Sequence, residues 1–300
     1  MKREIITSAQ NAKIKNLLLL QEKSKARREQ GIFVVEGRRE LEHCLAAGFS
    51  VRTLFVCPAL LGDRWPVGAG HDVRPSHGHD AGEEALPGAF ARIGSRSDAE
   101  GRASSPAGQP LVIEIPEALY RKVAYRESTE GIIAEVAYRE RTLEDLEVGE
   151  RPLVVVLESV EKPGNLGAIL RSADAARADA VLICDPLTDL YNPNLIRASI
   201  GAVFTVPTVC TTSAEAIAWL RARGIRILTA QLQDSAWYYD IDMTGGTALV
   251  MGTESTGLSP VWRHAADAHI RIPMLGRLDS LNVSVSTAIL LFEAVRQRHA

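Results

Sequence analysis

Short apolar runs alternate with amphipathic segments through the second half of the chain. Residues 153–157 are continuously apolar, which is typical of a strand buried on both faces of a sheet. Further strands are predicted at residues 180–184, 204–209, 225–230, 247–251 and 269–272. Helices are predicted at residues 165–177, 194–202, 213–223 and 260–265, with a last one within residues 280–298. This alternation predicts an α/β domain over residues 153–300, with a mostly parallel sheet and helices on both faces.

The first half of the chain shows a smaller pattern of the same kind. A helix is predicted over residues 8–30, and further helices at residues 38–47 and 116–123. Strands are predicted at residues 33–37, 53–57, 111–115 and 131–138. We therefore predict a smaller N-terminal α/β domain over residues 1–140 and, because the following segment is highly charged, a linker over residues 141–152.

Residues 66–110 break this pattern. They are rich in Gly, Ala, Pro, Ser and Arg and contain almost no β-branched residues. Such a composition cannot bury enough apolar surface to offset its chain entropy, so we predict a flexible insertion. His71, His77 and His79 lie close together in it, but no acidic or cysteine framework fixes them. We therefore expect no metal site there.

Composition narrows the class of protein. A chain of 300 residues that is 46% hydrophobic can form two ordinary domains, each with its own core. No apolar run approaches the length of a membrane helix, and the N-terminus lacks a signal-peptide pattern, so no membrane association is expected. The four cysteines are scattered, without metal or redox spacing. The expected location is the reducing cytoplasm.

Charge is distributed unevenly. The net charge is −3, but residues 1–40 contain ten Lys or Arg against five Glu, which leaves −8 for the remainder. A basic end on an acidic body can attract a phosphate backbone to one side of the molecule. A solvated helix surface explains the same pattern equally well.

Three segments in the second half place small and polar residues directly after apolar runs. The first, LESVEKPGNLGAILRSADA, is predicted to run from a strand into a helix. Gly167 and Arg171 are four residues apart and share a helix face, so the glycine leaves space beside the guanidinium. A helix start followed by an arginine suits a phosphate or an RNA backbone. The alternative is an ion pair of Arg171 with Glu158 or Asp174.

The second and third segments are LVMGTESTGLS and IPMLGRLDSLNVSVS. In the second, a strand ends at Gly252; the segment contains no nucleophile elbow, dinucleotide fingerprint or P-loop. In the third, Ser280, Asn282, Ser284 and Ser286 crowd a helix start where one cap would suffice. Because ligands of parallel sheets bind at the carboxyl ends of the strands, we expect the three segments to form one ligand site.

In the motifs NLGAILR, MGTESTGLS and IPMLGRLDSLNVSVS, the chain resembles the SpoU, or TrmH-type, RNA ribose methyltransferases of the SPOUT superfamily. The N-terminal segments ITSAQNAKIKNLLLL and FVVEGRRELEHCL are similar to the RNA-binding domain of that family, while residues 66–110 depart from its usual loop. The resemblance implies a trefoil knot in the C-terminal domain, S-adenosyl-L-methionine as the cofactor, a homodimer and no metal. It also implies methyl transfer to a ribose 2′-hydroxyl of RNA, with large-subunit ribosomal RNA as the expected substrate.

The resemblance also assigns residues. The cofactor is expected at backbone groups of Gly252, Ile272 and Leu281, with Thr229 and Ala230 as another wall. The expected catalytic residues are Arg171, Asn165, Glu254, Asn282 and Ser284. RNA-binding candidates are Lys13, Lys15, Lys23, Arg27 and Arg28.

Within the catalytic set, the family mechanism has the residue matching Arg171 activate the hydroxyl. A guanidinium is normally never deprotonated, so we expect Arg171 instead to hold the adjacent phosphate and stabilise the developing alkoxide. Asn165 would position the ribose, and Glu254 would orient Arg171 or another donor. Asn282 and Ser284 would hydrogen-bond the reacting nucleotide.

Several alternatives stay open. One is a tRNA ribose methyltransferase, and another is an antibiotic-resistance methyltransferase acting on large-subunit RNA. A third is a catalytically silent RNA-binding or ribosome-assembly factor, against which the intact Asn165, Arg171, Glu254 and Asn282 argue. A nucleotide-dependent oxidoreductase is disfavoured because the first strand–helix turn has no glycine fingerprint.

Overall fold

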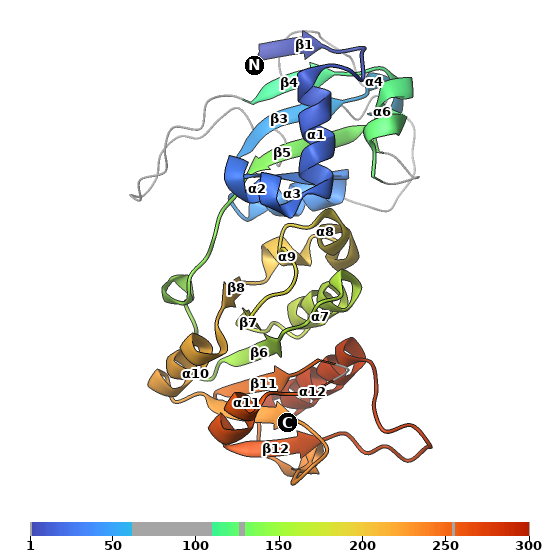
Figure 1. Ribbon diagram of the computed structural model, residues 1–300. Coiled ribbons are helices and arrows are strands. Elements are labelled where there is room, and N and C mark those ends of the chain that lie inside the picture. Colours follow the sequence, from blue (N-terminus) through green and yellow to red (C-terminus); the bar gives the residue numbers. More distant parts are fainter. Residues whose placement is uncertain (1, 62–109, 126–129, 254–255, 300) are drawn as a thin grey trace, which may run out of the picture. The chain divides into compact units, whose positions relative to one another are not determined.

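The computed structural model describes residues 2–61, 110–125, 130–253 and 256–299. The chain divides into two compact units, Met1–Tyr138 and Arg139–Ala300 (Figure 1). The predicted insertion, except residue 110, and Glu254 lie outside the described residues. Within the described ranges, no helix is long and apolar enough to cross a membrane.

The first unit is a mixed sheet with helices packed against it. Its described strands are β1 (Lys2–Ile5), β2 (Ile32–Glu36), β3 (Val51–Val56), β4 (Leu111–Glu114) and β5 (Ile132–Ala137), in the order β1-β4-β3-β5-β2. The helices are α1 (Ala12–Glu22), α2 (Ser24–Gln30), α3 (Arg38–Ala46), α4 (Pro58–Leu61) and α6 (Glu117–Val123). Strand β5 is antiparallel to β2 and β3, and the other pairs are parallel. Ile14, Leu17 and Leu20 of α1 are fully buried in the core of this unit.

Two features of the first unit differ from the sequence prediction. The helix predicted over residues 8–30 is two helices, because Lys23 is extended (φ −107°, ψ 108°) and separates α1 from α2. Helix α1 begins after Asn11, whose side chain accepts a hydrogen bond from the backbone N–H of Lys13. Strand β1 was not predicted, because its charged and largely exposed residues show no apolar alternation.

The second unit contains the parallel sheet. Its strands are β6 (Leu153–Glu158), β7 (Ala180–Cys184), β8 (Thr208–Thr211), β9 (Arg226–Ala230), β10 (Ala236–Trp237), β11 (Thr247–Met251) and β12 (Ala268–Arg271). Among the described residues they form one seven-stranded sheet in the order β10-β12-β9-β11-β6-β7-β8, and every pair is parallel. Strand β6 lies between β11 and β7 and is buried along its whole length. The predicted α/β class with a parallel sheet is therefore confirmed.

Helices cover both faces of this sheet (Figure 1). They are α7 (Pro163–Ala175), α8 (Pro193–Ser199), α9 (Ala202–Thr205), α10 (Ser213–Ala222), α11 (Pro260–Ala265) and α12 (Val283–Arg298), with 3-10 turns η2 (Leu143–Asp145) and η3 (Tyr238–Asp240). Helices α10 and α11 share a core with Val154 and Val156, and it includes Trp219 and Trp262. On the other face, α7 contacts α12 and α8.

Two predicted segments of the second unit need correction. Residues 204 and 205, predicted as strand, end helix α9, and the strand begins at Thr208. Packing of α9 against α7 outweighs the β-propensity of this segment. Residues 141–152, predicted as a linker, contain η2, and Leu143 and Leu146 join the core of the second unit.

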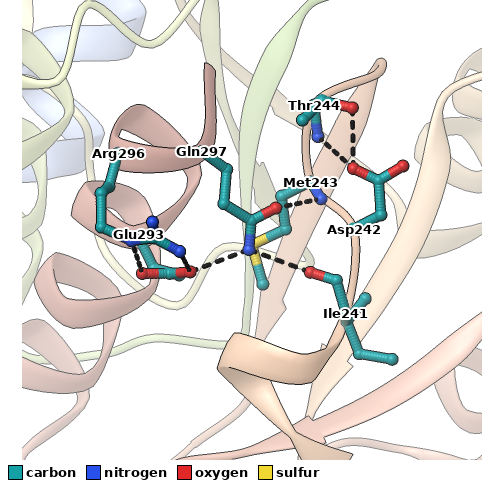
Figure 2. Close-up of polar contacts among 7 residues, drawn as sticks. All are labelled: Ile241, Asp242, Met243, Thr244, Glu293, Arg296 and Gln297. Atoms are coloured by element: carbon teal, nitrogen blue, oxygen red, sulfur yellow. Dashed lines mark hydrogen bonds and ion pairs between the residues drawn. The ribbon is translucent and has the colours of Figure 1, made fainter. Parts of the chain in front are cut away.

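The C-terminal end of α12 is fixed at the amino ends of the strands. The Gln297 side chain accepts a hydrogen bond from Met243 N (2.7 Å) and donates one to Ile241 O (3.0 Å), as Figure 2 shows. The neighbouring Arg298 guanidinium donates to backbone oxygens of Arg151 and Gly245, at 2.8 and 2.7 Å. Because this end is held there, the first turn of α12 lies at the carboxyl edge of the sheet.

Candidate active site

A cavity of about 580 Å³ lies at the carboxyl edge of the parallel sheet. It is lined by residues at the ends of three strands and just after them: 230–233 at the end of β9, 251–253 and 256–258 at the end of β11, and 270–272 and 274 at the end of β12. Residues 279–283, which lead into α12, complete the wall. Its size lies in the range of small-molecule sites. The second and third polar segments therefore converge on one cavity.

Asn282 begins helix α12 and connects it to α7. Its Oδ1 accepts hydrogen bonds from the backbone N–H (3.0 Å) and the hydroxyl (2.6 Å) of Ser284. Its Nδ2 donates to Oδ1 of Asn165 (3.1 Å), in the first turn of α7. Asn165 lines a smaller adjoining pocket together with Gly252, Thr253 and Val283. The first segment therefore meets the other two at the rim of the main cavity.

Arg171 lies on the exposed side of α7. It makes no hydrogen bond or ion pair with the part of the chain that the structure describes. Its two alternative partners are engaged elsewhere: Glu158 Oε2 accepts from Ser259 N (2.8 Å), and Asp174 Oδ1 accepts from Thr205 Oγ1 (2.6 Å). The ion pair considered from the sequence is therefore not formed, and the guanidinium is available to a ligand.

The glycine beside Arg171 has a different role from the one predicted. A Cβ at Gly167 would lie 2.6 Å from the Cβ of Ala198 and 2.7 Å from Ser199 N. The missing side chain therefore lets α7 approach α8, and the space is filled by that helix. The prediction that Gly167 clears space next to the guanidinium is wrong.

The turn after β11 is closed by two glycines. A Cβ at Gly252 would lie 2.4 Å from the carbonyl carbon and oxygen of Gly257. Gly257 has φ +66°, and its backbone exchanges hydrogen bonds with Thr253 at 3.1 and 3.3 Å. Gly252 lines the cavity, but the need for a glycine arises from this turn.

Most of the predicted cofactor residues line the main cavity. They are Ala230, Gly252, Ile272 and Leu281. Thr229 is fully buried, and its hydroxyl is hydrogen-bonded to His269 Nδ1 (2.6 Å), so it supports the wall. Two lining residues, Gln231 and Arg271, were not predicted; each directly follows or ends a strand, but no motif marks it.

The five predicted RNA-binding residues of the first unit differ in whether their charged groups are exposed and unpaired. Lys13 forms an ion pair with Glu4, and Lys23 lies 4.0 Å from Glu22. Lys15 and Arg28 are exposed and form no ion pair with the described residues. The structure corrects the prediction for Arg27.

The Arg27 side chain is 1% exposed. Its guanidinium donates to the backbone oxygens of Leu20 (2.6 Å) and Gln21 (3.1 Å) at the end of α1. Arg27 therefore stabilises a helix terminus and does not face a solvent-borne phosphate.

Two family models match this chain, one in each unit. Residues 152–292 match the family described as SpoU rRNA Methylase, and residues 11–75 match an MRM3-like substrate binding domain. A relative from Escherichia coli strain K12, the 23S rRNA (guanosine-2′-O-)-methyltransferase RlmB, is 41% identical over 175 residues, covering 56% of this chain and 72% of that protein.

Solved structures are similar over the whole chain. An RNA 2′-O ribose methyltransferase is 34% identical with a TM-score of 0.73, covering 99% of this chain and 100% of the other. An rRNA methyltransferase from Sinorhizobium meliloti with AdoMet bound is 28% identical with a TM-score of 0.79, covering 98% of each chain.

Proposed function

The chain belongs to the SpoU rRNA methylase family, and from that premise we propose that it methylates the ribose 2′-hydroxyl of a guanosine in large-subunit ribosomal RNA. The enzyme class is RNA ribose-2′-O-methyltransferase, and the cofactor is S-adenosyl-L-methionine. The guanosine and the large-subunit RNA are what the named E. coli relative acts on. The observation that carries the proposal is the Asn165–Asn282 hydrogen bond, which joins two of the three motifs at the rim of the cavity.

The cavity fits a nucleoside cofactor. Met251, Ile270 and Leu290 provide apolar walls, while Gln231 Oε1 and Arg271 Nε are buried polar atoms that no described residue meets with a hydrogen bond. When bound, S-adenosylmethionine supplies a methyl group on a positively charged sulfur. Backbone groups at Gly252, Ile272 and Leu281 would hold its adenosine.

The chain's own residues position the acceptor. Asn165 would orient the ribose from the first turn of α7, and Asn282 fixes Asn165 in turn. Because a guanidinium group is not normally a base, the role of Arg171 is to hold the adjacent phosphate and stabilise the developing charge on the 2′-oxygen. Ser284 acts through Asn282, to which its hydroxyl donates. Fixing both reactants in this way can supply a large part of the rate.

We further propose that the protein forms a homodimer. Asn165 and Arg171 are six positions apart in the sequence, which places them on different faces of α7. A site shared between two copies would let Arg171 of one copy serve the cavity of the other. The exposed side chains of Val285 and Phe292, 47% and 48% exposed, support a contact along α12, because residues seven apart share a helix face.

The knot, the roles of the two domains and the cellular location are proposed from the family to which the chain belongs. We propose that the C-terminal domain contains the family's trefoil knot, that residues 1–140 bind RNA, and that residues 153–300 carry the methyltransferase site. The match of residues 11–75 to a substrate binding domain supports the RNA-binding role. Four free cysteines support a reducing, cytoplasmic location.

The proposal is tested by mapping methylation. The full-length protein and S-adenosylmethionine are incubated with ribosomal RNA and, separately, with tRNA from a strain that lacks the gene. Mass spectrometry of nuclease digests is expected to show one new 2′-O-methylguanosine in large-subunit RNA. If only tRNA is methylated, the substrate is tRNA and not ribosomal RNA. If neither RNA is methylated, the result favours a catalytically silent RNA-binding factor.

A further inference from the structure

Three side chains from neighbouring strands form a row at the carboxyl edge of the sheet. Ala230 is paired with Ile270, and Gln231 N donates to Ile270 O (3.0 Å), so the register continues to Gln231 and Arg271. Two residues earlier, Thr229 and His269 are hydrogen-bonded across the same strands. Because alternate residues share a face, Gln231 and Arg271 lie on one face. Trp237 of β10 is paired with Arg271.

This row contains one buried donor and one buried acceptor that the described residues leave without a partner. Arg271 Nε and Gln231 Oε1 are buried and form no hydrogen bond with the described residues, and both residues line the main cavity. The rest of each side chain is fixed: the Arg271 guanidinium lies over the Trp237 ring (4.2 Å to its centroid), and Gln231 Nε2 donates to Gln233 O (2.9 Å). Buried polar atoms are rarely left unpaired, so the pair indicates a ligand group that is both acceptor and donor.

We propose that Arg271 and Gln231 hold the amino-acid end of S-adenosylmethionine, a role that rests on the proposed function. The α-carboxylate would accept from Arg271 Nε, and the α-ammonium would donate to Gln231 Oε1. This end is the zwitterionic part of the cofactor, and a guanidinium beside an amide oxygen matches its two charges. The neutral adenosine suits the apolar walls at Met251, Ile270 and Leu290.

The test compares two ligands that share the adenosine and the thioether. S-adenosylhomocysteine carries the amino-acid end, whereas 5′-methylthioadenosine lacks it. Calorimetry with the full-length protein measures the affinity for each ligand. We expect Arg271→Met to lower the affinity for S-adenosylhomocysteine about tenfold or more and to leave the affinity for methylthioadenosine unchanged. Gln231→Leu is expected to give a smaller loss, about threefold, for the same ligand only.

Arg226→Met is the matched control. Arg226 is an exposed arginine at the amino end of β9 that donates to Asp242 O, and its loss is expected to change neither affinity. Equal weakening of both ligands by Arg271→Met, or no weakening of either, would overturn the inference. If Arg271→Met does not fold, the affinities of Gln231→Leu for the two ligands decide, because only a selective loss for S-adenosylhomocysteine supports the inference. A wild-type protein that binds neither ligand would instead contradict the proposed function.

Discussion

Asn282 donates a hydrogen bond from Nδ2 to Oδ1 of Asn165 across 3.1 Å, although the two residues are 117 positions apart in the chain. The other end of the same amide caps helix α12 through the N–H of Ser284. One side chain therefore performs two tasks, one local and one between distant motifs. The two tasks can be separated by substitution.

Asn282→Ser is expected to keep the side-chain cap of helix α12 and to lose the hydrogen bond to Asn165. Serine is about as good a cap as asparagine but is too short to reach Asn165. We expect stability to change by less than about 0.5 kcal/mol, while single-turnover methylation falls about tenfold or more. Thermal unfolding and rapid-quench kinetics measure the two effects.

Ser284→Ala is the control for this experiment. It removes one hydroxyl donor to Asn282 but keeps the backbone hydrogen bond of the cap. Because Asn282 still reaches Asn165, we expect a smaller loss of rate than for Asn282→Ser. Equal rates for wild type and Asn282→Ser would mean that the connection has no catalytic importance.

Arg171→Ala is expected to abolish methylation without unfolding the protein. The side chain is exposed and pairs with none of the described residues, so stability should change by less than about 0.5 kcal/mol. Calorimetric binding of S-adenosylhomocysteine should persist, because Arg171 does not line the main cavity. Arg171→Lys should restore little activity, since an ammonium does not reproduce bidentate phosphate contacts. An unchanged single-turnover rate in the alanine variant would refute the proposed role.

Gly167→Ala is expected to destabilise the second unit by about 1–3 kcal/mol, because its Cβ would force α7 away from α8. Gly164→Ala, one turn earlier in the same helix, is the matched control. Outside the local helix backbone, no described residue lies within 4 Å of a Cβ at that position, so the stability of this variant should be unchanged or slightly higher. Calorimetric melting of both variants tests the pair. Similar melting temperatures would show that α7 and α8 can separate without cost.

Gly167 also shows where prediction from the sequence ends. Its spacing from Arg171 predicts a shared helix face, but no local pattern reveals that Gly167 is buried against Ala198 of α8 while Arg171 is exposed. By contrast, the apolar run at residues 153–157 was sufficient to predict β6 as a strand buried in the sheet, because burial on both faces requires such a run. Motif order predicted the convergence of three turns, whereas Gln231 and Arg271 became visible only through strand register.

Lys15 and Arg28 should differ from Arg27 in their effect on RNA binding. Each exposed cation that contacts a phosphate contributes about 0.7–0.9 to the slope of log K against log salt. We expect Lys15→Ala and Arg28→Ala to lower that slope and keep stability. Arg27→Ala should instead destabilise the first unit by about 1–3 kcal/mol, because the carbonyls of Leu20 and Gln21 lose a buried donor. Filter binding across a salt series measures the slopes. Unchanged slopes in both exposed variants would identify this surface as merely solvated.

The buried carboxyl group of Glu135 should make the stability of the first unit depend on pH. It lies in the middle of β5, 7% exposed, and burial raises its pKa above the ordinary value of 4.5, against the lowering effects of Thr53, Lys13 and Asn16. The folded chain therefore keeps this proton to higher pH than the unfolded chain does. Its contribution to stability is full below 4.5 and declines as the pH rises through the raised folded pKa.

Glu135→Gln removes this titration and keeps a neutral amide of similar shape. We expect the variant to melt at a higher temperature than wild type at pH 8, with the difference shrinking toward pH 4, where the wild-type carboxyl is protonated as well. Glu215→Gln is the control of opposite sign. Hydrogen bonds from Thr212 and Thr211 lower the pKa of Glu215, so that carboxylate stabilises the folded chain at neutral pH and the benefit fades as the pH falls. Calorimetry at three pH values compares the variants, and a Glu135→Gln difference that is the same at pH 4 and pH 8 would contradict the raised pKa.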